Sequence, residues 1–318
     1  MQLLRVKSIT DGSIGYINVN GQVVIKPVFY DAGFFDDLGL AVVRPTNRSS
    51  IGYINQAGEL AIKPTLFSAQ EFSKVGLASV SFFNKADNFV NGYIDTAGKV
   101  QFIVDCESCG TFDDVLHIAR IRTNNYYYGY IDKNNQIVIP PTFEKLGEFS
   151  SNGLARAMRG KSRGYINLQG DFVTKLKFRR FEGFDSSFLA WFKYKKKYGY
   201  INAQGEIVIE PIYSEAASFH IGLAKVKVNR KYGFINTKGE FEIPPILSNV
   251  SSFSSAGHAL FVDRNKKMGC IDKIGAILIK PKYDDIDFSD YPNILMVVKE
   301  GERGYMDIHE NWISNYRV

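Results

Sequence analysis

The chain has 318 residues, of which 45 % are hydrophobic, 23 % charged and 14 % aromatic, and its formal net charge is +6. This composition is typical of a folded protein and excludes a disordered chain. No stretch approaches the roughly 18 apolar residues of a membrane span, and residues 1–7 lack the features of a signal peptide. The three cysteines are too few for a disulfide framework, so we expect a cytoplasmic protein.

One phrase, Gly-Tyr-Ile-Asn/Asp-x-x-Gly, recurs along the sequence. It first occurs at residues 15–21, and eight further copies, some with small departures, follow at intervals of 34 to 40 residues. A nearly fixed period of this length predicts a repeat array. The anchor glycines, which open each copy, are Gly15, Gly52, Gly92, Gly129, Gly164, Gly199, Gly233, Gly269 and Gly304. We predict a single repeat domain, 1–318, of nine units at about 1–38, 39–75, 76–115, 116–152, 153–187, 188–221, 222–256, 257–292 and 293–318.

Each unit predicts three strands in chain order. The first is an apolar run such as residues 40–43, the second carries Gly-Tyr-Ile, and the third is a run such as residues 207–209. Between the second and third, an Asx followed three residues later by Gly, as in Asn202 and Gly205, favours a tight turn. A proline such as Pro211 ends the third strand. Because the third run is apolar at consecutive positions, we expect it to be covered on both faces.

The eleven residues after the proline position link one unit to the next. Most of these linkers carry a regularly placed Phe, which predicts a packed crossover or a short fourth strand. Units three and five depart from the pattern, because Val104 and Leu176 replace the proline. Their linkers contain Cys106-Glu-Ser-Cys109 and Phe178-Arg-Arg-Phe181.

The repeat resembles the bacterial WG-repeat (KWG-type) family, whose units read as Lys-Trp-Gly-Tyr-Ile-Asp-x-x-Gly, an apolar strand, Pro, Tyr-Asp and Phe. The best matches are residues 197–213 and 231–245. The family's Trp is absent, since Tyr, Ile, Arg and other residues precede the nine anchor glycines, as Tyr198 and Tyr232 do. The resemblance implies a β-repeat scaffold without a general catalytic motif.

From this pattern we predict an all-β fold. Nine tandem three-stranded antiparallel meanders would form an open superhelical repeat array. A closed, β-propeller-like toroid is the alternative. The open form is favoured because nine units exceed the roughly four to eight blades of most propellers.

No arrangement of residues predicts catalysis, a metal or a cofactor. The four histidines fall in different units, and Cys106-x-x-Cys109 has zinc or redox spacing without a second ligand pair. Nucleophile elbows, phosphate loops and dinucleotide fingerprints are absent from the sequence. We therefore expect that the protein is not an enzyme and has no catalytic or metal-binding residues and no cofactor.

Charge follows position within the repeat. The eight residues before the anchor glycine hold 21 Lys/Arg and 4 Asp/Glu in units two to nine, whereas the linkers of units one to eight hold 17 Asp/Glu and 6 Lys/Arg. The acidic linkers could offset the basic loops, which we favour, or an anionic partner could do so. The basic loops are densest in units five to seven. The predicted binding residues are Arg159, Lys161, Arg163, Lys193, Lys195, Lys196, Lys197, Arg230 and Lys231.

We therefore predict a non-catalytic binding or scaffolding module. It would recruit a protein partner, or an anionic surface or polymer, along its repeat surface. One alternative is a propeller-like hydrolase, which a deep pocket with carboxylates from several units would favour. Another is a cell-surface structural repeat protein.

Overall fold

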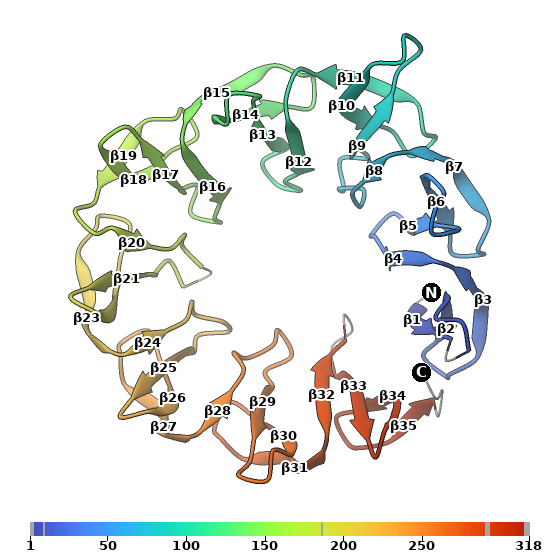
Figure 1. Cartoon of the computed structure of the whole chain (residues 1–318). Coiled ribbons are helices and arrows are strands. Elements are labelled where there is room, and N and C mark those ends of the chain that lie inside the picture. Colours follow the sequence, from blue (N-terminus) through green and yellow to red (C-terminus); the bar gives the residue numbers. More distant parts are fainter. Residues whose placement is uncertain (1–2, 9, 186, 290–292, 315–318) are drawn as a thin grey trace. The chain divides into compact units, whose positions relative to one another are not determined.

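A computed structural model of the chain describes residues 3–8, 10–185, 187–289 and 293–314. These residues form 35 strands and no helix, arranged in nine small antiparallel sheets. The chain divides into two compact units, residues 1–144 and residues 145–317. Within each unit the sheets follow one another in a curved row, with the first strand of a sheet on the concave side and the last on the convex side (Figure 1).

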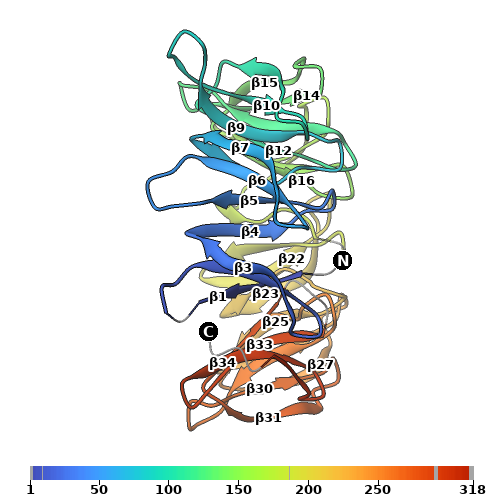
Figure 2. The same ribbon diagram turned by 90° about the vertical axis from the view of Figure 1, so that its right-hand side faces the viewer.

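The first unit contains four sheets. Their strand orders are β1-β2-β3, β4-β5-β6-β7, β8-β9-β10-β11 and β12-β13-β14-β15. Figure 2 shows the sheets of this unit side by side, from β1 up to β10. The strands are β1 (Leu3–Lys7), β2 (Ile14–Asn18), β3 (Val23–Phe29), β4 (Asp31–Phe35), β5 (Leu40–Arg44), β6 (Ile51–Asn55), β7 (Leu60–Leu66), β8 (Ser68–Ala69), β9 (Ala78–Phe83), β10 (Phe89–Ile94), β11 (Val100–Val104), β12 (Ser108–Phe112), β13 (Ile118–Arg122), β14 (Tyr128–Asp132) and β15 (Ile137–Phe143).

The second unit contains five sheets, each of four strands in chain order from β16 to β35. The strands are β16 (Lys145–Phe149), β17 (Ala155–Arg159), β18 (Ser162–Ile166), β19 (Phe172–Lys175), β20 (Arg180–Phe181), β21 (Ala190–Tyr194), β22 (Lys197–Ile201), β23 (Ile207–Tyr213), β24 (Glu215–Ala216), β25 (Ala224–Val228), β26 (Lys231–Ile235), β27 (Phe241–Leu247), β28 (Asn249–Val250), β29 (Ala259–Val262), β30 (Met268–Ile271), β31 (Ile277–Tyr283), β32 (Asp285–Phe288), β33 (Ile294–Lys299), β34 (Glu302–Asp307) and β35 (Trp312–Ser314).

The prediction of three-stranded meanders is wrong for eight of the nine sheets. The linker supplies a fourth strand, which opens the next sheet; β24, for example, pairs with β25 through Glu215 and Lys227. Within each unit the sheets are set like the blades of a β-propeller (Figure 1). They match the propeller-like alternative rather than the open superhelical array that the sequence favoured.

The glycine that opens the repeated phrase allows two backbones to approach closely. Gly199 lies opposite a bulge in β23, where the pairing moves from Tyr198 with Tyr213 to Tyr200 with Ile209. A Cβ atom at Gly199 would lie 2.4 Å from the Ile209 carbonyl oxygen, which no side chain tolerates. This close approach is the structural reason for the anchor glycine.

The tyrosine of the phrase joins neighbouring sheets. Tyr200 is fully buried, and its hydroxyl donates a hydrogen bond of 2.7 Å to the carbonyl oxygen of Ala217, beside the first strand of the next sheet. The same bond, always across 17 residues, links Tyr16 to Gly33, Tyr53 to Gln70, Tyr93 to Gly110 and Tyr165 to Glu182. We call this contact the inter-sheet tyrosine bond. It satisfies a hydroxyl that would otherwise be buried without a partner.

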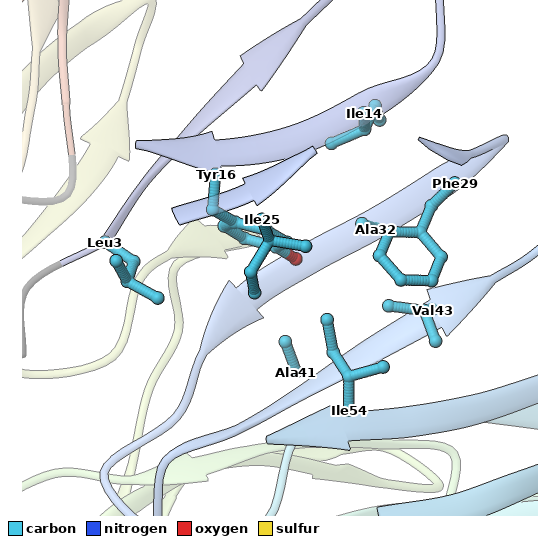
Figure 3. Close-up of a cluster of buried hydrophobic side chains, with 9 residues drawn as sticks. All are labelled: Leu3, Ile14, Tyr16, Ile25, Phe29, Ala32, Ala41, Val43 and Ile54. Atoms are coloured by element: carbon cyan, nitrogen blue, oxygen red, sulfur yellow. The ribbon is translucent and has the colours of Figure 1, made fainter. Parts of the chain in front are cut away.

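The apolar core lies between consecutive sheets. Figure 3 shows the first such layer, in which residues of β1 to β3 face residues of β4 to β6. The third strand that was predicted for each repeat unit is not covered on both faces. In β23, for example, Ile209 is 6 % exposed, but Ile207 and Val208 are each 45 % exposed. The reason is that β23 is the outermost strand of its sheet, so only the residue that faces a neighbouring sheet is buried.

Candidate binding surface

The structure places the nine predicted binding residues on three hairpins of the second unit. These hairpins join β17 to β18, β21 to β22 and β25 to β26. They occupy the same place in three consecutive sheets of identical strand order. The basic loops therefore have equivalent positions in neighbouring sheets, whereas their role in binding stays a prediction.

All three hairpins turn within two residues. The pairing of Tyr194 with Lys197 leaves Lys195 and Lys196 as the turn, with φ angles of 44° and 71°. Two consecutive positive φ angles are those of a type I′ turn, for which Asn-Gly is the preferred sequence. Lysine is unfavourable at both positions, because the left-handed conformation brings its Cβ close to the backbone. The turn therefore carries two ammonium groups at positions where lysine lowers the stability of the fold.

Several of the cations contact neutral groups. Lys193 Nζ donates a hydrogen bond of 3.2 Å to the hydroxyl of Tyr198 and lies 4.6 Å from the centre of that ring. Lys231 Nζ donates to Ser248 Oγ at 2.7 Å, and Lys195 Nζ lies 5.3 Å from the centre of the Tyr194 ring. These contacts orient the side chains but leave their positive charge uncompensated.

A neighbouring sheet shows how such a cation can be neutralised within the chain. Lys227 lies on β25 opposite Glu215 on β24, and its Nζ is 2.7 Å from Glu215 Oε1. The Tyr232 hydroxyl donates to the other carboxylate oxygen at 2.6 Å. The hydrogen bonds from Lys227 and Tyr232 hold the pKa of Glu215 below its ordinary value. Here the acidic linker offsets the basic hairpin, as the sequence analysis favoured.

The sheet β20–β23 reverses this arrangement. The position that corresponds to Glu215 is Arg180, and it stands opposite Lys193. Among the described residue pairs between the first and second strands of the four-stranded sheets, this is the only one in which both residues are cations. Like charges directly across two strands are destabilising. Arg180 is exposed, so a partner could reach it.

We define the basic hairpin as Arg180, Lys193, Lys195, Lys196 and Lys197. The last three are exposed, and Lys193 is half-buried. Within the described part of the chain, none of these five cations forms an ion pair. The arrangement can hold a group with several negative charges, whose carboxylates or phosphates would replace the acid missing from this sheet.

Sequence reasoning missed Arg180 as a binding residue. It noted the departure Phe178-Arg-Arg-Phe181 but did not align the linkers by strand position. Once aligned, the same position holds Asp31, Glu215 and Asp285 in other sheets. The signal was therefore present as a reversal of charge at one repeat position.

Two clefts bear on the hydrolase alternative. One, in the first unit, has a volume of about 630 Å³ and holds two carboxylates, Asp11 and Asp31. The backbone N–H and the hydroxyl of Ser13 donate to Asp11 and lower the pKa of that carboxyl to about 2, so it is ionised and unsuited to act as a general acid. The second cleft, of about 370 Å³, lies in the second unit and is lined by His258, Leu278, Ile308, His309 and Glu310.

The described ranges show neither a metal-binding cluster nor a membrane-spanning helix. These residues contain no group of three or more His, Cys, Asp or Glu side chains placed to hold a metal ion. They also contain no helix that is long and apolar enough to cross a membrane.

One solved structure resembles the chain in fold, and others align with lower scores. A crystal structure of a eukaryotic initiation factor aligns with a TM-score of 0.64 at 10 % identity, over 98 % of this chain and 94 % of that one. BamB from Moraxella catarrhalis aligns over 98 % and 96 % at 10 % identity, with a TM-score of 0.41. The C-terminal WD40 domain of Sif2 aligns over 96 % and 97 % at 8 % identity, with a TM-score of 0.45. Only the first score is high enough to indicate a shared fold, and identities this low say nothing about activity.

Sequence comparison identifies the family. No curated protein matches the chain. One family profile, described as a WG containing repeat, matches seven segments: residues 14–45, 51–85, 128–161, 164–198, 198–232, 232–266 and 268–302. These segments cover well over half of the sequence and coincide with seven of the nine copies of the repeated phrase, although Tyr, Ile, Arg or Met stands where the family has Trp. The chain therefore belongs to the family of WG-containing repeat proteins.

Proposed function

We propose that the chain is a non-catalytic binding module whose basic hairpin holds an acidic segment of a protein partner. The observation that carries the proposal is the pairing of Arg180 with Lys193, at a position where β24 and β25 pair Glu215 with Lys227. Because this sheet has no acid of its own opposite Lys193, a carboxylate from another chain would relieve more charge repulsion here than in a sheet that has one.

The chemistry of the basic hairpin favours carboxylates over nucleic acid. Four of its five cations are lysines, whose flexible ammonium groups act as point charges. Binding of single-stranded nucleic acid generally adds aromatic rings that stack on the bases. The exposed ring nearest to the turn is Tyr194, and Lys195 Nζ lies 5.3 Å from its centre. The five cations also sit within one sheet, which suits a short acidic segment.

The turn itself supplies a clean variant. Replacing Lys195→Asn and Lys196→Gly removes two charges and installs the sequence that a type I′ turn prefers, so the fold should be at least as stable. We expect affinity for a fluorescent poly-glutamate peptide, measured by anisotropy in low salt, to fall about tenfold. The wild-type affinity should itself fall steeply as salt rises, since exposed charges are screened.

The matched control removes two exposed lysines from the first unit, by Lys63→Asn and Lys85→Asn. Its affinity should match the wild type. Equal weakening by the control would show a general charge effect and reject the basic hairpin. Tighter binding of a single-stranded oligonucleotide than of the peptide would reject an acidic protein partner. Thermal unfolding of every variant separates loss of binding from loss of fold.

A further inference from the structure

Two cysteines lie where the chain passes from β11 to β12 in the first unit. Cys106 follows β11, Cys109 lies in β12, and each is 7 % exposed. Both belong to a core cluster with Tyr93, Val104 and Phe112. They also lie in the stretch between residues 85 and 128, which the family profile leaves unmatched. This repeat therefore departs from the family pattern at the place where the cysteines occur.

The repeat explains the spacing of the two cysteines. In the other sheets for which these positions are described, the residues 14 and 17 positions after the anchor glycine, which correspond to the two cysteines, are apolar and buried or half-buried. Equivalent pairs in the same unit are Phe29 with Ala32 and Leu66 with Ala69, and in the second unit Tyr213 with Ala216, Leu247 with Val250 and Tyr283 with Ile286. Where other sheets have an apolar pair, this sheet has two thiols.

The two sulfur atoms touch. Cys106 Sγ and Cys109 Sγ are 2.6 Å apart, whereas the remaining cysteine, Cys270, is buried in the second unit. The described residues offer no further His, Cys, Asp or Glu that would complete a metal site with them. We propose that Cys106 and Cys109 form a reversible disulfide, made by exchange with a small-molecule disulfide such as glutathione disulfide and broken by the corresponding thiol, glutathione.

The two protein thiols and one molecule of glutathione disulfide are the only reactants that this exchange needs. The thiolate of one cysteine attacks a sulfur of glutathione disulfide, forms a mixed disulfide and releases one glutathione. The second cysteine then attacks its neighbour's sulfur and releases the second glutathione. Each cysteine loses one proton and each glutathione gains one, so two protein thiols are oxidised and one glutathione disulfide is reduced.

The reaction should be slow in the folded protein. The hydrogen bond between Cys109 and Cys106 and the burial of Cys109 both raise the pKa of the Cys109 thiol, so little thiolate forms at neutral pH. Exchange therefore needs a local opening of the connection. Once formed, the bond would close a segment that contains Glu107, whose carboxylate lies 3.1 Å from Arg122 Nε. It would thus fix an ion pair at the start of the next sheet.

Mass spectrometry tests the proposal directly on the wild-type protein. Trypsin should release residues 100–120 as one peptide that holds both cysteines, because Lys99 precedes it and Arg120 ends it. After equilibration of the folded protein with glutathione disulfide, we expect this peptide to lose two hydrogen atoms. The number of titratable thiols should fall from three to one, with Cys270 left reduced.

A comparison with unfolded protein shows whether the fold drives the reaction. The equilibrium between dithiol and disulfide in a glutathione buffer should favour the disulfide about tenfold more in the native protein than in concentrated urea. By linkage, oxidation should raise the melting temperature of the wild type. The double variant Cys106→Leu, Cys109→Ala, which copies Leu66 and Ala69, should show no response to the oxidant.

Three outcomes would overturn the proposal. The peptide could keep its reduced mass after prolonged equilibration, it could carry glutathione instead of an internal bond, or the disulfide could be less favoured in the native than in the unfolded chain. Each is read from the wild-type protein, so the result does not depend on whether the double variant folds.

Discussion

Two hairpins at the same place in the repeat use their cations in opposite ways. In the first unit, Arg122 ends β13, its Nε lies 3.1 Å from the Glu107 carboxylate, and its guanidinium carbon lies 4.7 Å from the centre of the Tyr126 ring. In the second unit, Lys193 has the equivalent place on β21 but faces Arg180. The repeat therefore fixes where a cation stands, and the residues at the start of the adjacent first strand decide whether its charge is satisfied internally, as by Glu107, or is available to a partner.

The first prediction tests whether the two sheets share one framework despite these different hairpins. A Cβ at Gly129 or at Gly199 would lie 2.4 Å from a backbone oxygen of the outer strand. We expect Gly129→Ala and Gly199→Ala each to lower the free energy of unfolding by about 3 kcal/mol, as severe overpacking does. Urea unfolding measures both. A large difference between the two variants would break the comparison, because the sheets would then not be equivalent.

The second prediction concerns the inter-sheet tyrosine bonds that join the preceding sheet to β12–β15 and to β20–β23. Tyr93 donates to Gly110 of β12 at 2.7 Å, and Tyr165 donates to Glu182, beside β20, also at 2.7 Å. Removing either hydroxyl leaves a partly buried carbonyl without its donor, so Tyr93→Phe and Tyr165→Phe should each cost about 1–2 kcal/mol. Thermal and urea unfolding should agree on this loss. No loss in either variant would mean that the hydroxyls contribute nothing to stability.

The third and smallest effect comes from giving the sheet β20–β23 the charge arrangement of the neighbouring sheet β24–β27. Arg180→Glu places a carboxylate opposite Lys193, as Glu215 stands opposite Lys227. We expect a gain in stability of about 0.2–1 kcal/mol, since a cross-strand repulsion becomes an attraction. Affinity for the poly-glutamate peptide should fall at the same time. Unchanged affinity would mean that the charge of Arg180 does not contribute to binding and affects only stability.

The sequence predicted much of the fold because most of the nine units repeat the same local signals. The Asx-to-Gly turn is an example: Gly205 N donates to Asn202 O at 3.0 Å, and Gly205 has a φ of 81°. The fourth strand was harder to predict, because β20, β24 and β28 have only two residues each. The propeller-like setting of the sheets depends on packing between sheets, which apolar runs such as residues 207–209 do not encode.

The candidate site was predicted in part. The basic loops stand out as charge before each anchor glycine, and the structure brings them to one end of neighbouring sheets. Which of those charges are satisfied could not be read without strand register. Lys227 and Lys193 look alike in the sequence, and only their partners Glu215 and Arg180 distinguish them.

The inter-sheet tyrosine bond also has a consequence for synthesis on the ribosome. Each bond spans only 17 residues, so a sheet can complete its buried face as soon as the first strand of the next sheet has emerged. Contacts that are local in sequence form quickly, because little chain has to be ordered to close them. We therefore expect each sheet to fold during translation once the first strand of the following sheet has left the ribosome, so that only the most recently synthesised sheet remains incompletely packed.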